Sequence, residues 1–173
     1  LRGLRNEATT LFFFFLGFTS FSDQREPEEV IERLNLYFEI ASRVMLRHGG
    51  YIDKFIGDGL LAIFGVPVFR ENHVERAVQA AIDLQHDLQK AGNNGNSLLA
   101  SVGISIDTGV VVSGNIGSQI KMEYTVIGNS VNVASRLNGL AKQGEIIISK
   151  TVYEQVGQKI VASPLPPQSV KGV

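Results

Sequence analysis

Two short segments of the sequence hold side chains that could bind a ligand or a metal ion. The first is DKFIGD, in which Lys54 and Asp58 stand four residues apart and glycines flank the acid. A carboxylate at a glycine turn suits Mg²⁺, a hard cation that takes one or two protein carboxylates and otherwise binds phosphate and water. Taken alone, this spacing favours a simpler interpretation, in which Asp58 stabilises a turn and Lys54 is a surface residue.

The second segment is GNSVNVASR, in which Asn132 and Arg136 are also four residues apart. On a helix that begins after Gly128, this spacing places both side chains on one face. Asn and the planar fork of Arg can hold ribose and phosphate oxygens. A solvated polar face is the simpler interpretation of such a pair.

Other segments suggest less chemistry. The segment 114–117, GNIG, could cradle a phosphate, but it matches neither a Walker loop nor a dinucleotide fingerprint, so we expect a plain turn. His48, His73 and His86 have no ligand spacing, and we expect them at the surface or at helix ends. The sequence suggests no Ser-His-Asp or Cys-His arrangement.

The hydrophobic pattern indicates which elements would position these residues. Helices are expected at 27–48, 74–92, 128–140 and 149–156. Strands are expected at 8–15, 51–55, 60–64, 98–106, 110–113, 122–127 and 145–148, with a hairpin turn at 107–109 and a loop at 93–96. The order of these elements up to residue 115 predicts an α/β (α+β) fold with a ferredoxin-like βαββαβ core, one helical face and one open face.

Composition limits the function classes. The chain has 173 residues, 44% of them hydrophobic, which predicts one globular domain over 1–173. A net charge of -1 creates no overall field for nucleic acid or an anionic membrane, so neither is expected as a partner. The absence of cysteine excludes disulfides and fits a cytoplasmic setting. Without an initiator Met or a signal-peptide pattern, we expect a domain excised from a longer multidomain protein, whose other parts could include a membrane anchor.

Several segments follow one another in an informative order: GFTSF, DKFIGDGLLAIFG, ERAVQAA, GISIDTGVVVSGNIGS, EYTVIGNSVNVASRLNGLAKQGEIIIS and a late VKG. Together they resemble the class III adenylate and guanylate cyclase catalytic domain, from about Thr10 to Gly172. The resemblance implies a core related to polymerase palms, in which two domains pair head to tail as a homodimer or heterodimer. It also implies conversion of ATP to 3',5'-cyclic AMP and pyrophosphate by in-line attack of the ribose 3'-hydroxyl on the α-phosphate, with two Mg²⁺ or Mn²⁺ ions per site.

The resemblance assigns nucleotide-binding roles position by position. Lys54 and Thr125 resemble the pair that selects the purine, and a common adenylyl variant has Asp in place of Thr125. Lys donates to adenine N1 and a Thr hydroxyl can accept from the adenine amino group, so the pair favours ATP. Asn132 resembles the residue that orients the ribose, and Arg136 the one that stabilises charge on the α-phosphate. Lys171 matches the triphosphate-binding lysine.

The resemblance also assigns a metal and phosphate side. Asp58 resembles the second of two metal-binding aspartates. The backbone of Phe15, Gly17, Phe18 and Thr19 would embrace the phosphates, and the Phe15 carbonyl would be a metal ligand.

Phe14 departs from the pattern of the family. Active members read F-A-D-I-x-G-F-T where this chain reads FFFFLGFT, which places Phe14 at the first metal aspartate. Loss of a group that only supports a metal ligand costs roughly 10–100-fold in affinity or activity, so loss of a ligand should cost at least that. Three explanations stay open: a natural degenerate partner of an intact domain, a nucleotide-binding regulatory pseudocyclase, or an altered stretch of sequence. We expect an adenylate cyclase domain, with the catalytically impaired pseudocyclase as the alternative.

Overall fold

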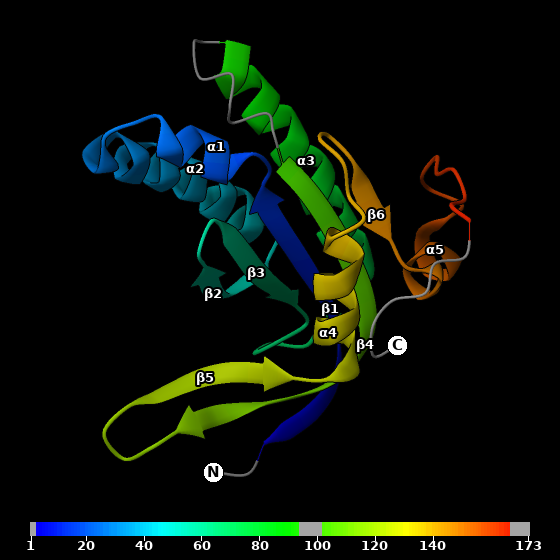
Figure 1. Ribbon diagram of the computed structural model, residues 1–173. Coiled ribbons are helices and arrows are strands. Elements are labelled where there is room, and N and C mark those ends of the chain that lie inside the picture. The colour runs from blue at the N-terminus through cyan, green and yellow to red at the C-terminus, as the bar shows by residue number, and fades with distance from the viewer. Residues whose placement is uncertain (1–2, 94–101, 167–173) are drawn as a thin grey trace.

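The computed structural model describes residues 3–93 and 102–166 (Figure 1). Its strands are β1 (Leu4–Phe15), β2 (Tyr51–Ile56), β3 (Gly59–Phe64), β4 (Val102–Gly117), β5 (Met122–Ile127) and β6 (Ile146–Ile148). Its helices are α1 (Phe18–Asp23), α2 (Pro27–Arg47), α3 (His73–Asn93), α4 (Asn129–Asn138) and α5 (Lys150–Val156). The predicted loop beyond residue 93, the start of the predicted strand 98–106 and Lys171 lie outside the described residues. Helix α1 is an element that the sequence pattern did not predict.

The strands form one sheet around β1. The order is β2-β3-β1-β4-β5, and β6 pairs in parallel with β4. β1 lies between β3 and β4 and is antiparallel to both. The segment 114–117, expected as a turn, is instead the end of β4 and pairs with β5. This topology confirms the predicted α+β fold with a βαββαβ core.

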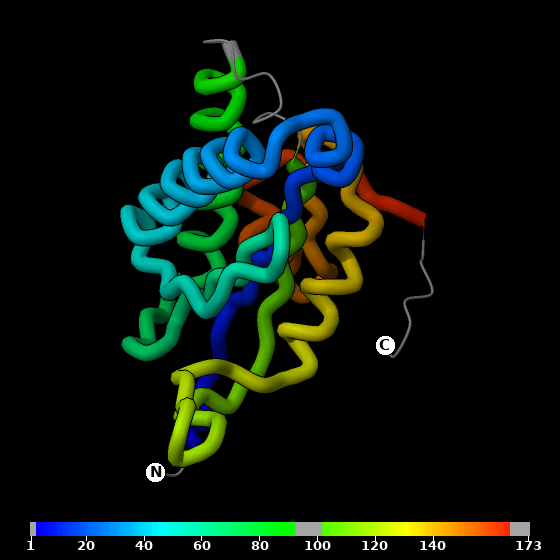
Figure 2. The backbone as a smooth tube through the Cα atoms, turned by 60° about the vertical axis from the view of Figure 1, so that its left-hand side comes forward, coloured from blue at the N-terminus to red at the C-terminus, as the bar shows by residue number. Residues whose placement is uncertain are grey.

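Helices cover both faces of the sheet (Figure 2). Helices α2, α3 and α5 pack on one face, where Phe13, Phe64 and Leu84 are fully buried. Helix α4 lies on the other face, where Ala134 belongs to a second apolar cluster with Phe12 of β1. The prediction of an open face is therefore wrong in part, because the apolar side of α4 is buried against β1 and β4.

The predicted hairpin at 107–109 is also wrong, because β4 continues through these residues. Gly109 pairs with Ala8 of β1, and Thr108 pairs with Thr9. Thr9 Oγ1 donates to Thr108 Oγ1 at 3.0 Å, and Thr108 Oγ1 donates to the Ala8 carbonyl oxygen at 3.1 Å. The long neighbour β1 offers a pairing partner at every position here, and such tertiary pairing overrides local turn preference.

His73 differs from the expectation of a surface position. It begins α3, as expected for a helix end, but its side chain is buried. His73 Nδ1 lies 2.6 Å from Thr9 Oγ1. Because the Thr9 proton is directed to Thr108, His73 donates from Nδ1 and Thr9 accepts. Burial lowers the pKa of His73, and the negative charge of Glu7 opposes this shift.

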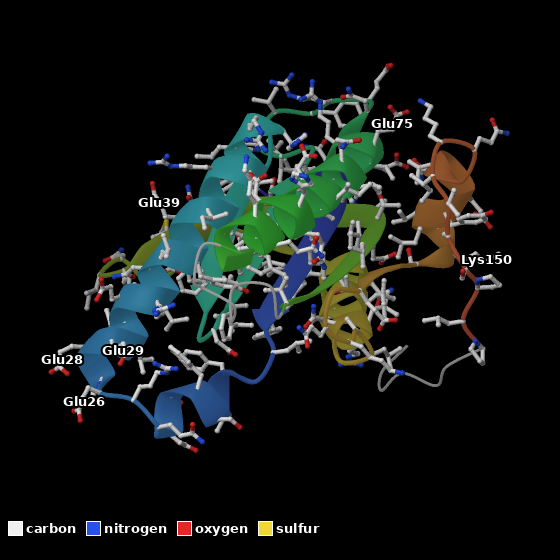
Figure 3. The ribbon with its side chains drawn as sticks, turned by 90° about the horizontal axis from the view of Figure 1, so that it is seen from above. Glu26, Glu28, Glu29, Glu39, Glu75 and Lys150 are labelled. Atoms are coloured by element: carbon white, nitrogen blue, oxygen red, sulfur yellow. The ribbon has the colours of Figure 1, made fainter. Side chains whose placement is uncertain are left out.

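The outer surface of the helical layer is charged, as Figure 3 shows for the labelled glutamates of α2. Glu28 and Glu29 occupy the first turn of α2, where negative charge interacts favourably with the helix dipole. His48 lies at the end of α2, with Nε2 2.6 Å from Asp83 Oδ2, and His86 is exposed, so the expectation holds for both histidines. Among the described residues, no helix has the length and apolar character that crossing a membrane requires.

Candidate active site

Four phenylalanines, 12–15, end β1, and their side chains alternate between the two faces of the sheet. Phe13 and Phe15 contact Tyr37 of α2, with ring centroids 5.3 and 5.2 Å away. Phe12 and Phe14 lie on the opposite face, with ring centroids 4.8 Å apart. The strand end where the resemblance expects a metal ligand is therefore packed with aromatic rings on both faces.

An open pocket of about 420 Å³ lies at this end of β1. Its walls are residues 14–20, Asp58, and the end of α4 with the loop that follows. Gly17 has a φ of 76°, a left-handed conformation that favours glycine, and it lets the chain turn from β1 into α1. The residues predicted for the metal and phosphate side thus gather around one pocket, and they are Phe14, Phe15, Gly17, Phe18, Thr19 and Asp58.

Asp58 lies in the turn between β2 and β3, as predicted. Its carbonyl oxygen accepts a hydrogen bond from the Phe15 amide at 3.2 Å, which ties the turn to the end of β1. Burial raises the pKa of the Tyr37 hydroxyl, and the negative charge of Asp58 raises it further. Among the described residues that line the pocket, Asp58 is the one acid.

A second polar group lies where β2 meets β5. Lys54 Nζ is 3.5 Å from Asp53 Oδ2, and Thr125 Oγ1 donates to the same oxygen at 2.9 Å. The side chain of Asp53 is fully buried. Burial raises the pKa of Asp53, whereas the hydrogen bond from Thr125 and the charge of Lys54 act in the opposite direction. The structure therefore brings together Lys54 and Thr125, the residues predicted to select the purine.

Helix α4 carries the residues predicted to act on the ribose and α-phosphate. Asn132 is exposed, and Arg136 Nη1 is buried without a hydrogen-bond partner among the described residues. Asn138 at the end of α4 donates from Nδ2 to the carbonyl oxygens of Phe12 at 3.1 Å and Gly103 at 2.9 Å. These two bonds fix α4 to β1 and β4.

The predicted site residues form separate groups within one chain. Neither Asn132 nor Arg136 lines the pocket around Asp58, and neither Lys54 nor Thr125 does. This separation is what a site shared between two domains requires, since each domain would then supply one group to each site.

Sequence reasoning missed two residues of this region. Asp53 stands in the DKFIGD motif, but a carboxylate next to Lys54 on a strand would be expected on the opposite face. Asn138 could have been found, because Ser130, Ala134 and Asn138 are four residues apart and share the buried face of α4.

Comparison with known proteins identifies the class of domain that this fold and site define. The family model of the adenylate and guanylate cyclase catalytic domain matches residues 4–172, so the chain belongs to this family. It is 33% identical over 177 residues to adenylate cyclase 1 of Rhizobium meliloti (strain 1021), a match that covers 97% of this chain and 26% of that protein.

Two crystal structures show the same fold. The adenylyl cyclase CyaB from P. aeruginosa matches with a TM-score of 0.94 and 31% identity, over 100% of this chain and 91% of that chain. The guanylyl cyclase Cya2 matches with a TM-score of 0.91 and 37% identity, over 100% of this chain and 89% of that chain. An adenylyl cyclase and a guanylyl cyclase therefore share this fold, so the fold alone does not decide between the two purines.

The family generally uses divalent metal ions. The residues at this pocket do not fit a pair of ions, because Phe14 presents an apolar ring beside the single carboxylate of Asp58. In the part of the chain that the structure describes, no group of three or more His, Cys, Asp or Glu side chains could hold an ion. Asp58 offers one cation a single carboxylate, with phosphate oxygens left to complete its coordination.

Proposed function

We propose that this domain is of the adenylyl type and binds ATP, the substrate that such a site converts to 3',5'-cyclic AMP and pyrophosphate. The observation that carries the proposal is the convergence of Lys54 Nζ and Thr125 Oγ1 on Asp53 Oδ2, at 3.5 and 2.9 Å. A cationic donor and a hydroxyl thereby approach the same carboxylate oxygen.

The edge of adenine complements this pair. Adenine presents an unprotonated N1, which accepts a hydrogen bond, beside an amino group, which donates one. Lys54 can only donate, and Thr125 can accept. Guanine reverses both groups, with an N–H at N1 and a carbonyl oxygen at position six, so Lys54 would face a donor and Thr125 would lose the amino group from which it accepts. The similarity to adenylate cyclase 1 of Rhizobium meliloti supports the same choice.

The remaining roles follow the chemistry of the ring closure. The ribose 3'-hydroxyl gives up its proton to water and its oxygen forms a bond to the α-phosphorus. The bond from that phosphorus to the bridging oxygen breaks, and pyrophosphate leaves with the electron pair. Asn132 would orient the ribose, and Arg136 would stabilise charge on the α-phosphate oxygens. Lys171, outside the described residues, would bind the triphosphate. Neither Asn132 nor Arg136 lines the pocket around Asp58, so in this proposal a working site combines two domains, in a homodimer or a heterodimer.

Phe14 limits turnover in this proposal. Its ring stands at the pocket where a second carboxylate would be needed, so we expect the chain alone to bind ATP and turn it over slowly. The same observation favours a second candidate function. The chain keeps Lys54 and Thr125 for the purine but has Phe14 where a metal-binding aspartate is expected. It would then serve as the partner of an intact cyclase domain or as a nucleotide-binding regulatory module.

Cyclic AMP production from Mn²⁺-ATP by the purified domain, beside the variant Phe14→Asp, tests the proposal. We expect little product from the chain itself and a gain of at least about tenfold in the variant, because a carboxylate joins Asp58 at the pocket. Phe14→Asn, which removes the ring but adds no charge, is the control and should give no such gain. If the unchanged chain is as active as Phe14→Asp, the role given to Phe14 is wrong. If ATP binds but neither protein makes product, the regulatory candidate is favoured.

A further inference from the structure

We propose that Asp53 is a positioning residue for purine selection, which holds the proton of the Thr125 hydroxyl so that Thr125 can only accept a hydrogen bond from the base. This inference rests on the proposed function, since it explains how that site would prefer adenine. Asp53 itself need not touch the nucleotide.

A β-bulge in β2 gives Asp53 its position. Ile52 pairs with Ala62 and Lys54 pairs with Leu61, so Asp53 is an extra residue between two paired positions. In a regular strand, consecutive side chains point to opposite faces, and a bulge interrupts this alternation. The result is visible in the 3.5 Å between Lys54 Nζ and Asp53 Oδ2, because two consecutive side chains reach one point.

The direction of the hydrogen bond decides what Thr125 can offer a ligand. Thr125 Oγ1 lies 2.9 Å from Asp53 Oδ2, and an ionised carboxylate can only accept, so the hydroxyl proton points to Asp53. The lone pairs of Oγ1 remain for a donor such as the adenine amino group. A hydroxyl without this partner could rotate and donate to the guanine carbonyl oxygen equally well, and it would not discriminate.

The surroundings of Asp53 support a dedicated role. Its side chain is fully buried, whereas that of Lys54 is 43% exposed and can reach a ligand. Oδ1 of Asp53 is buried with no hydrogen-bond partner among the described residues. An unpaired buried carboxylate oxygen destabilises the fold, so a residue that only joined two strands would be better replaced by a neutral one.

The polar contacts therefore form a short relay. The negative charge of Asp53 is transmitted through the Thr125 hydroxyl to the base, while Lys54 presents positive charge beside it. A carboxylate placed directly at residue 125 would have the same acceptor character. This equivalence gives the experiment a rescue variant.

The experiment measures equilibrium binding of ATP and GTP, each with Mn²⁺, to the full chain and to Asp53→Ala. The ratio of the two dissociation constants is the readout. We expect the unchanged chain to prefer ATP and Asp53→Ala to lose roughly 10- to 100-fold of that preference, because the freed hydroxyl can also donate to guanine. Adding Thr125→Asp to Asp53→Ala should restore the preference. The same ratio of kcat/KM values in the Phe14→Asp background provides a second readout.

Two further variants separate positioning from damage to the fold. Asp53→Asn, whose amide oxygen can still accept from Thr125, should keep more of the ATP preference than Asp53→Ala and serves if the alanine variant does not fold. Glu123→Gln is the control, because it removes another carboxylate whose charge acts on Asp53. Glu123 Oε1 lies 3.4 Å from Lys121 Nζ, and the Glu123 side chain is mostly exposed. The ratio of the ATP and GTP dissociation constants should therefore not change in this variant.

The outcomes are distinct. If the unchanged chain prefers ATP and Asp53→Ala weakens both nucleotides equally, Asp53 is structural and this inference is wrong, while the proposed function stands. If the unchanged chain shows no preference for ATP over GTP, the proposed function fails and this inference fails with it.

Discussion

Phe14 of β1 lies directly opposite Gly59 of β3, and its ring fills the space that a side chain at residue 59 would need. A Cβ built on Gly59 would stand 2.6 Å from Phe14 Cε1 and 2.8 Å from the carbonyl oxygen of Phe13. Atoms at these separations overlap. The aromatic strand end and the glycine that follows Asp58 are therefore matched to each other in shape.

Gly59→Ala should destabilise the domain by about 1–3 kcal/mol, because the new methyl group overlaps both a ring and a backbone oxygen. Urea unfolding measures the change. The double variant Gly59→Ala with Phe14→Ala should recover only part of the lost stability, since the Phe13 carbonyl oxygen remains 2.8 Å from the new Cβ at residue 59. Gly109→Ala is the matched control, because its Cβ would find its nearest neighbour at an ordinary 3.4 Å. Equal destabilisation by both glycine variants would contradict this account.

A mixture of two chains should show whether the site is shared between domains. The double variant Phe14→Asp with Arg136→Ala is expected to be nearly inactive alone, because it lacks the group proposed to stabilise charge on the α-phosphate. Mixed with the unchanged chain, it should make cyclic AMP, since one site of each mixed dimer would combine two carboxylates of the variant, Asp58 and the one introduced at residue 14, with Arg136 of the unchanged chain. The rate is measured against the mixing ratio. A mixture no more active than its components would argue against a shared site.

Asn138→Ala should lower the free energy of unfolding by about 2–3 kcal/mol, because two buried backbone carbonyls lose their donor. It should also weaken nucleotide turnover in the Phe14→Asp background, since α4 carries Arg136. Asn129→Ala, an exposed change at the other end of α4, is the control and should stay within about 0.5 kcal/mol. Denaturant unfolding and cyclic AMP rates are the measurements. Asn138→Ala with unchanged stability would refute the structural role.

Stability should fall on acidification through the protonation of His73. The pKa of His73 is lowered by burial, so the unfolded chain takes up a proton near pH 6.5 while the folded chain resists it. The stabilising contribution is therefore complete above that pH and decreases below it. The loss of stability from pH 7 to 5 should be smaller in His73→Gln. The raised pKa of Asp53 favours the folded state in acid and so acts in the opposite direction. This contribution is the same in the unchanged chain and in His73→Gln, so it cancels when their stabilities are compared. Parallel pH profiles would show that His73 does not titrate as described.

The sequence alone determined α2, through the amphipathic pattern that begins at Pro27. It also determined β2 and β3, through the paired apolar runs on either side of Asp58. In each case local periodicity fixes which face of the element is buried. The motifs likewise determined the family, and they indicated Lys54, Thr125, Asn132 and Arg136 as candidates.

Only the tertiary structure decided the rest. Residues 107–109 resemble a turn, and their pairing with β1, about a hundred residues away in the chain, makes them a strand. His73 is buried because α3 packs it against Thr9 of β1. Asp53 meets Thr125 because a bulge in β2 redirects its side chain and β5 approaches from 72 residues away. Composition and spacing describe what each segment prefers by itself, whereas these contacts depend on which distant segment lies beside it.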